Sequence, residues 1–339
     1  MTTAEGRARL ERLWSRGCKL LGVRHAIMGG AMTWVSERNL VAAISNAGGF
    51  GVIACGAMTP DLLAAEIAGA RALTDRPFGV NLITMHPDLE RLIGVCADHK
   101  VGHVVLAGGL PTTATMAQVK QAGARVLCFA PALAIAKRLV RMGADGIVIE
   151  GAEAGGHIGP VTTSVLAQEI LPAVTDVPVY VAGGIGRGDA IAGHLRMGAS
   201  GAQLGTRFVC ATESIAHAKF KAAFLRASAR DAQPSAQLDP RFAVIPVRAL
   251  INGATRRFAD KQREVIARFD SGELDQKTAQ LEIEHFWAGA LRRAVIEGDI
   301  ENGSLMAGQS VGMVTAEQTT AEIIAELVDQ AAEALGREA

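Results

Sequence analysis

Aromatic residues are scarce in this chain of 339 residues: they make up 4% of it, and only one is a tyrosine, Tyr180. An excess of one charge sign is missing too, because 34 basic residues balance 34 acidic ones. With no net charge and no basic block, nucleic acid is not an expected partner. No run approaches the roughly 18 apolar residues that indicate a membrane-spanning helix, so no membrane is expected either.

Cysteine is also sparse, and its pattern excludes two classes of protein. The five cysteines are odd in number, scattered, and form no CxxC pair: Cys18, Cys55, Cys96, Cys128 and Cys210. Neither a zinc site nor a disulfide framework is therefore expected. The first twenty residues are charged and lack an apolar segment, which argues against a signal peptide. We expect a cytoplasmic protein without a metal.

Glycine, in contrast, is abundant at 38 residues, and short β-branched runs alternate with longer helical stretches. We expect strands at 25–28, 50–54, 78–84, 103–109, 125–130, 145–151, 177–184 and 201–208. These runs are almost wholly apolar, as strands buried on both faces are. Eight such strands, each followed by a helical stretch, predict a (β/α)8 TIM barrel. An open doubly wound sheet would have fewer strands and usually an early GxGxxG, which "GGAM" does not match.

The stretches between and after the strands predict helices and a cover for the barrel. A helix over 38–49 should end at Gly48 or Gly49, and Pro60 should open a helix over 60–74. We expect the barrel in residues 1–221, a helical segment over its C-terminal mouth in 222–300, and a loop and helix that return to the barrel in 301–339. Thr315, with a capping box to Gln318, should open that last helix.

Two glycine-containing stretches follow the last two predicted strands. After strand seven comes "AGGIGRGD", in which Gly183, Gly184, Gly186 and Gly188 leave backbone N–H groups available to an anion, with a helix beginning near Asp189. Strand eight ends in "LGTRF", where Gly205 and Thr206 add an N–H and a hydroxyl. These loops are neighbours in a barrel and often bind phosphate there. We predict a phosphate site, against the alternative of two ordinary turns.

Polar or small residues also stand at other strand ends. Strand one ends in "IMGGAM", and a flat ring could lie against the backbone of Gly29, Gly30 and Met32. Asn81, Glu150 and Gln203 are polar residues in apolar runs. Each fits either a hydrogen bond to a ligand or, as for Asn81, an amide satisfied within the barrel core.

"EGAEAGGHIG", after strand six, places Gly155 and Gly156 directly before His157. Small residues permit close approach of a bound molecule, and a histidine titrates near neutrality, which suits acid–base catalysis. The alternative is a loop histidine bonded to backbone. We predict a catalytic role for His157, and we keep His285 in "EHFWAG" as a weaker candidate facing the mouth.

The ordered motifs resemble the nitronate monooxygenase (2-nitropropane dioxygenase) family, which includes flavin-dependent enoyl-ACP reductase II enzymes. They are "GGAMTWVSERNLVAAISNAGGFGVI", "DRPFGVNL", "EGAEAGGHIGPVTT", "VYVAGGIGRGDAIAGHLRMGASGAQLGTRFV" and "GDIENGSLMAGQSVGMV". The resemblance implies bound FMN and gives His157 the catalytic role. It places FMN contacts at Gly29, Gly30, Met32, Asn81, Glu150, Gly155, Gly156, Gly183, Gly184, Gln203, Gly205 and Thr206.

Within this family the resemblance leaves the reaction open. We expect an oxidoreductase for a small-molecule substrate, most of all one that oxidises alkyl nitronates with O2 to carbonyl compounds and nitrite. Reduction of enoyl thioesters or quinones with NAD(P)H is the alternative, and a flavin-binding sensor without turnover is a third. Ser304, Met306 and Gln309 in the 301–314 loop are candidates for substrate contacts. A homodimer stays open.

Overall fold

The computed structural model describes residues 3–242, 244 and 246–337. Its main sheet has eight parallel strands in the order β1-β9-β8-β6-β5-β4-β3-β2. The outer two strands of that order meet at a parallel bridge between Met28 and Phe50, where the Gly29 N–H donates to the Phe50 carbonyl at 2.9 Å. The predicted (β/α)8 barrel is thereby confirmed. The strands are β1 (Ile27–Gly29), β2 (Gly51–Ala54), β3 (Phe78–Ile83), β4 (His103–Ala107), β5 (Arg125–Phe129), β6 (Gly146–Glu150), β8 (Val179–Ala182) and β9 (Gly201–Leu204).

The helices between these strands begin and end where their sequences favour it. Thr59 caps the first turn of α4 by accepting from the Leu62 N–H, and Pro60 takes the first helical position, where a missing N–H costs nothing. Gly48, with φ of 89°, follows the end of α3. The helices around the barrel are α3 (Arg38–Asn46), α4 (Pro60–Leu73), α5 (Leu89–Asp98), α6 (Thr113–Gln121), α7 (Leu133–Arg141), α8 (Thr163–Ile170) and α9 (Gly188–Arg196).

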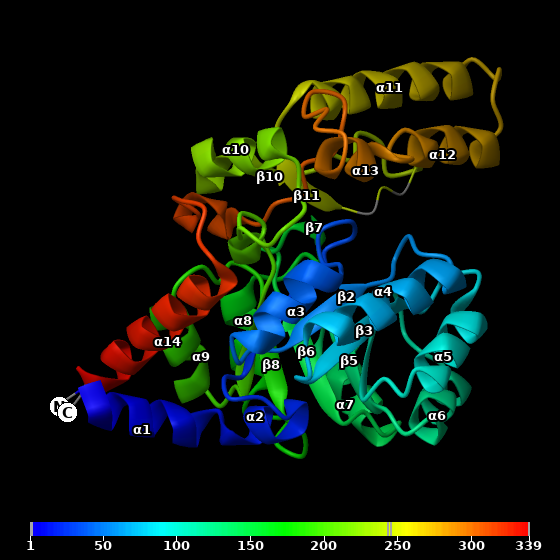
Figure 1. Cartoon of the computed structure of the whole chain (residues 1–339). Helices are drawn as coiled ribbons and strands as arrows, with labels where there is room; N and C mark the ends of the chain where they lie inside the picture. Colours follow the sequence, from blue (N-terminus) through cyan, green and yellow to red (C-terminus); the bar gives the residue numbers. More distant parts are fainter. Residues whose placement is uncertain (1–2, 243, 245, 338–339) are drawn as a thin grey trace.

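Two N-terminal helices, α1 (Thr3–Leu13) and α2 (Ser15–Leu21), lie at the end of the barrel opposite the predicted site (Figure 1). The single tyrosine belongs to this end. Tyr180 on β8 is fully buried and donates its hydroxyl to the Gly17 carbonyl of α2 at 2.8 Å. Its role is structural, because a buried phenol needs a hydrogen-bond partner.

The helix that completes the barrel is α14 (Thr320–Gly336), which packs against α9, α1 and α3. It occupies the place of an eighth barrel helix, although it follows β9 by more than a hundred residues. The predicted start of this helix was wrong. Thr319, in a capping box with Glu322, caps it, because Gln318 and Ala211 form a bridge and the Gln318 carbonyl accepts from the Thr212 N–H.

The chain between β9 and α14 stands over the C-terminal end of the barrel (Figure 1). We expected this segment to be helical, but it also contributes two strands. β11 (Val247–Leu250) pairs antiparallel with β10 (Ala232–Pro234) and with β7 (Gly156–His157), a two-residue strand in the predicted catalytic stretch. The other elements are η1 (Thr206–Phe208), α10 (Ala218–Arg226), η2 (Ala229–Asp231), α11 (Gly253–Asp270), α12 (Gln276–His285), α13 (Ala290–Val295) and η3 (Gln309–Met313). The domain boundaries at 221 and 300 stay predictions; α10 crosses the first.

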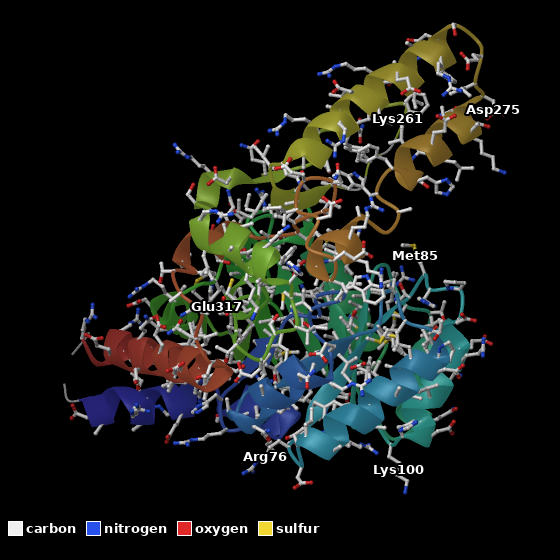
Figure 2. All side chains as sticks on the ribbon, turned by 45° about the horizontal axis from the view of Figure 1, so that its top comes forward. Arg76, Met85, Lys100, Lys261, Asp275 and Glu317 are labelled. Carbon is white, nitrogen blue, oxygen red and sulfur yellow. The ribbon has the colours of Figure 1, made fainter. Side chains whose placement is uncertain are left out.

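Helices α11 and α12 form a lobe that extends away from the barrel (Figure 1). The lobe has a small core of its own: Phe242, Phe258, Val265, Ala279 and Ile283. Its outer surface carries charged side chains such as Lys261, visible with Asp275 in Figure 2. His285 is exposed on α12. Within the described ranges, no helix combines the length and apolar character that crossing a membrane requires.

Candidate functional site

The loop between β8 and α9 presents backbone N–H groups that lack partners. Gly183 and Gly184 have φ of 93° and 71°, a conformation that strongly favours glycine. In the described part of the chain, the N–H groups of Gly183, Gly184 and Gly186 have no hydrogen-bond acceptor, and the side chain of Arg187, the N-cap residue of α9, makes no capping hydrogen bond. A helix N-terminus beside such a turn suits an anion. Gly188 does not belong to this set as predicted, because its N–H donates to Gln330 Oε1 at 2.8 Å.

The loop after β9 lies beside the first strand. The predicted eighth strand corresponds to β9, which ends at Leu204, earlier than predicted, and the chain then enters η1. A Cβ added to Gly30 would lie 3.0 Å from Gly205 Cα, so this glycine is required by the close approach of two backbones. The Thr206 hydroxyl accepts from the Gly308 N–H at 2.9 Å and keeps its own proton for a further acceptor. Thr206 therefore connects the predicted phosphate loop to the 301–314 loop.

Inside the barrel mouth, polar side chains stand at one level of the sheet. The strand register aligns Glu150 with Ala182, Ala182 with Gln203, and Gln203 with Met28. Neither Glu150 nor Gln203 has a hydrogen-bond partner for its side chain among the described residues. Burial raises the pKa of the Glu150 carboxyl to about 8, although part of its surface faces the open end of the barrel. Unpartnered buried polar groups of this kind are expected where a ligand supplies the partner.

Asn81 has a partner within the barrel. It is buried in β3 and its amide donates to the Val105 carbonyl of β4 at 3.1 Å. The structural interpretation of this residue thus accounts for one of its donors. Contact of the remaining amide atoms with a cofactor stays a prediction.

The end of β1 has fewer available donors than expected. The Gly29 N–H serves barrel closure, and the Met32 N–H donates to the Ser36 hydroxyl at 3.0 Å. Sequence reasoning missed Trp34 in the same loop. Its φ of 69° is rare for a residue with a bulky side chain, and the Arg292 guanidinium of α13 lies 5.8 Å from its ring centroid. The loop after β1 and helix α13 of the segment over the barrel mouth therefore lie in contact here. The sequence gives no sign of the positive φ of Trp34.

The small residues before His157 make room for protein backbone. A Cβ on Gly155 would lie 2.5 Å from the Gly308 nitrogen and 2.6 Å from the Ala307 carbonyl carbon. Gly156 has φ of 80° and faces the Met306 sulfur. Packing against the 301–314 loop therefore explains the missing side chain at Gly155. Contact of these glycines with a cofactor stays a prediction.

His157 lies opposite Val247 in the pair of strands β7 and β11. Its side chain is exposed and makes no hydrogen bond within the described ranges, which excludes the alternative of a histidine bonded to backbone. The surrounding protein partly desolvates the ring and lowers its pKa below the usual value. The imidazole is thus neutral at pH 7 and has a free nitrogen to accept a proton.

The three loop candidates differ in position. Met306 adjoins Gly156, and the Gln309 N–H donates to the Glu153 carbonyl at 2.9 Å, so both lie against the His157 stretch. Ser304 is buried, and its N–H donates to the Ala290 carbonyl of α13 at 3.0 Å, away from that stretch.

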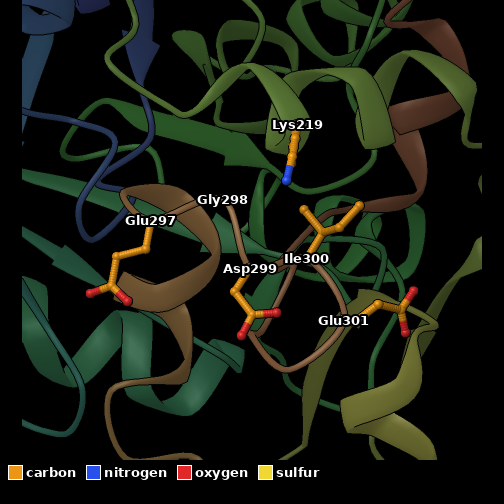
Figure 3. Close-up of a pocket in the computed structure, with 6 residues that line it drawn as sticks. All are labelled: Lys219, Glu297, Gly298, Asp299, Ile300 and Glu301. Carbon is orange, nitrogen blue, oxygen red and sulfur yellow. The ribbon is translucent and has the colours of Figure 1, made fainter.

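A cavity of about 480 Å³ lies elsewhere, between the start of α10 and the turn after α13 (Figure 3). Its lining is Lys219, Glu297, Gly298, Asp299, Ile300 and Glu301. None of the predicted site residues contributes to it.

Comparison with known proteins agrees with this arrangement. A family model described as nitronate monooxygenase matches residues 15–330. A nitronate monooxygenase of Paraburkholderia phytofirmans is 32% identical over 292 residues, covering 71% of this chain and 77% of that protein. An octahydro-indene-carboxyl-CoA dehydrogenase of Mycobacterium tuberculosis is 37% identical over 213 residues, or 62% of this chain. The match spans only 59% of that dehydrogenase, and 62% of its Rhodococcus jostii counterpart.

Solved structures resemble nearly the whole chain. The structure of FabK from Thermotoga maritima superposes with a TM-score of 0.85 at 36% identity, over 95% of this chain and 97% of that one. A nitroalkane oxidase from Streptomyces ansochromogenes gives 0.77 at 28% identity, over 95% and 99%. These neighbours and relatives are oxidoreductases. From the barrel, the loops at its mouth and the match over residues 15–330, we conclude that the chain belongs to the nitronate monooxygenase family.

Proposed function

We propose that this oxidoreductase binds FMN and oxidises alkyl nitronates with O2 to carbonyl compounds and nitrite. The observation that carries the proposal is the convergence of unpartnered N–H groups at Gly183, Gly184 and Gly186 with an exposed, neutral His157 at the same end of the barrel. The family match and the nitronate monooxygenase relatives support it.

The residues present fit FMN. The N–H groups after β8 and the hydroxyl of Thr206 would hold the phosphate, since an anion there satisfies loop donors that otherwise have no partner. Gln203 and Glu150, both without side-chain partners, would bond the polar edge of the ring. With a pKa of about 8, Glu150 is largely protonated at pH 7 and can donate as well as accept.

When bound, FMN supplies the electron and hydride chemistry, and the chain supplies position and proton transfer. His157 is the group for the proton. Its lowered pKa keeps one ring nitrogen unprotonated at neutral pH, so it can remove the α-proton of a neutral nitroalkane and release the nitronate. A nitronate added in its anionic form has already lost this proton and does not need the base.

The similarity to FabK over nearly the whole chain, and to a CoA-thioester dehydrogenase, favours a second candidate. This is reduction of an enoyl thioester with NAD(P)H as reductant. His157 would then be protonated by solvent and would deliver a proton to the α-carbon of the substrate. The same side chain serves both reactions, because only the direction of proton transfer differs.

One anaerobic experiment separates the candidates. Purified protein should be yellow and release FMN on denaturation. It should then be mixed with a preformed alkyl nitronate, NADH or NADPH while flavin absorbance is followed. Bleaching by nitronate alone supports the first candidate, and bleaching by a reduced nicotinamide supports the second. Protein that is colourless and cannot be reconstituted with FMN would exclude both.

His157→Ala tests the role of the base. FMN should stay bound, because the predicted phosphate contacts lie on other loops. Activity on a neutral nitroalkane should fall about 10²–10⁴-fold, the usual contribution of proton transfer, whereas much of the activity on preformed nitronate should survive. If the enzyme uses an enoyl thioester instead, flavin reduction should survive and turnover should fall. Wild-type rates on both neutral substrates would contradict the role.

A further inference from the structure

Arg248 on β11 is a buried cation that is only 8% exposed. The Glu153 carboxylate is near enough to interact with it electrostatically, but the two side chains make no hydrogen bond to each other. Instead, the Arg248 Nε donates to the Ala152 carbonyl at 2.9 Å and its Nη1 donates to the Ala232 carbonyl at 2.6 Å. Burying a guanidinium costs free energy, because the group loses its hydration, and hydrogen bonds to protein acceptors must offset that loss. The fork of donors joins two segments that lie far apart in the sequence.

One of these segments leads directly into His157. Ala152 stands five residues before the histidine, in the stretch that follows β6. On the other side, Arg248 is opposite Gly156 in the strand pair, and Val247 is opposite His157. The Ile158 N–H donates to the carbonyl of Pro246, the residue before β11, at 3.0 Å, so the chain is held by backbone contacts on both sides of His157.

No hydrogen bond of its own fixes the position of the His157 side chain. It has no hydrogen-bond partner among the described residues, and the two residues before it are glycines, which have no side chain that could contact the ring. Its position is therefore set by the backbone contacts of its stretch. Glu153 supplies other contacts: its carboxylate accepts from the Thr163 N–H and its carbonyl from the Gln309 N–H, both at 2.9 Å. Glu153 and Arg248 are the charged side chains in this arrangement.

We propose that Arg248 is a positioning residue for His157: by joining Ala152 to β10 and β11, its guanidinium holds the histidine over the mouth of the barrel. The inference rests on the proposed function of His157. A lysine at 248 would keep the charge but, as a point donor on a flexible stem, would not reproduce the planar two-carbonyl contact.

The test uses the flavin-loaded full chain with Arg248→Met and Arg248→Lys. Lys221→Met is the control, because Lys221 is also a buried cation bonded to a backbone carbonyl, that of Ala211 at 2.7 Å, but lies on α10, where it also pairs with Glu317 at 3.5 Å. In Arg248→Met, kcat on a neutral nitroalkane should fall roughly 10- to 100-fold, a part of the effect of losing the base. Activity on preformed nitronate and FMN content should stay within twofold. Arg248→Lys should lie between Arg248→Met and wild type, and the control should match wild type.

A readout without turnover accompanies the kinetics. Histidine NMR titration, with the His157 signal identified by its absence in His157→Ala, should show a pKa below 6.5 in the wild type and closer to 6.5 in Arg248→Met, because a released loop is better hydrated. If Arg248→Met does not fold, the same two measurements on Arg248→Lys decide.

Several outcomes would overturn the inference: equal losses on the neutral nitroalkane and the nitronate, a loss no larger than in the control, or an unchanged His157 titration. Arg248→Met should also add little to the loss already caused by His157→Ala, and additive losses would refute the coupling. If His157→Ala has no effect, the proposed function of His157 fails. If His157→Ala has its expected effect but the Arg248 variants have no effect, only the positioning role of Arg248 fails.

Discussion

Replacing Thr206 with valine tests the connection between the phosphate loop and the 301–314 loop. Valine has nearly the same shape but removes the acceptor of the Gly308 N–H, which lies 2.9 Å from the hydroxyl. Gly308 is buried, so its N–H would be left unpaired, at a cost of about 1–3 kcal/mol in the free energy of unfolding. The cost should appear in the protein without flavin.

A second effect should appear in flavin affinity. If the hydroxyl also donates to the FMN phosphate, its loss removes a hydrogen bond to a charged group, worth about 1.5–3 kcal/mol. The dissociation constant for FMN should then rise roughly 10- to 150-fold. Urea unfolding of the flavin-free protein measures the first effect, and titration followed by quenching of flavin fluorescence measures the second.

Two variants make this measurement specific. Thr206→Ser keeps the hydroxyl and should retain most of the affinity. Thr320→Val makes the same exchange at a fully buried threonine whose hydroxyl has no partner among the described residues, so it should not destabilise the protein. A Thr206→Val protein that behaves like Thr320→Val in both assays would refute the reasoning.

Three other substitutions have direct expectations. Gly184→Val places a side chain at a φ of 71° and 3.0 Å from Glu153 Cβ, so FMN should be lost while circular dichroism still reports a folded barrel; full flavin occupancy would count against the phosphate site. Burial lowers the pKa of His25 from 6.5 to about 4, so the unfolded chain binds the proton first and stability should fall as the pH drops from 6.5 to 4, by about 1–3 kcal/mol because the ring is only partly buried. In His25→Gln the urea midpoint of unfolding should depend less on pH over that range, and the same pH dependence as in the wild type would contradict this. Met306→Ala should change KM more than FMN content, because Met306 adjoins Gly156; unaltered kinetics would make the contact structural.

The barrel and the position of its mouth could be predicted from sequence, because apolar strands and the glycines after them are local signals. The pairing of β7 with β11 could not, since a strand of two residues has no periodicity and its partner lies ninety residues further along. The role of Gly155 was missed for the same reason: a glycine shows that something comes close, but not whether it is a ligand or the backbone of residues 307–308.

Competing caps and donors account for the remaining differences. Thr315 and Thr319 both have the sequence of a helix cap, and the contact of Gln318 with Ala211 and Thr212 decides for the second. In the sequence Gly188 resembles the other loop glycines, but in the structure its N–H donates to Gln330 of α14. Arg248 gave no signal, because its partners are backbone carbonyls, which any sequence possesses.

The late position of α14 has a consequence for synthesis. All eight strands have left the ribosome before the helix that fills the gap between α9 and α3 has been made. Until then the apolar faces of its neighbours, and the side chains that will meet Leu327 and Ala331, stay open to water or to chaperones. The intervening segment must therefore emerge while the barrel is incomplete, and a chain stopped at residue 318 should be recovered from cells as aggregate rather than as a folded barrel that lacks only α14.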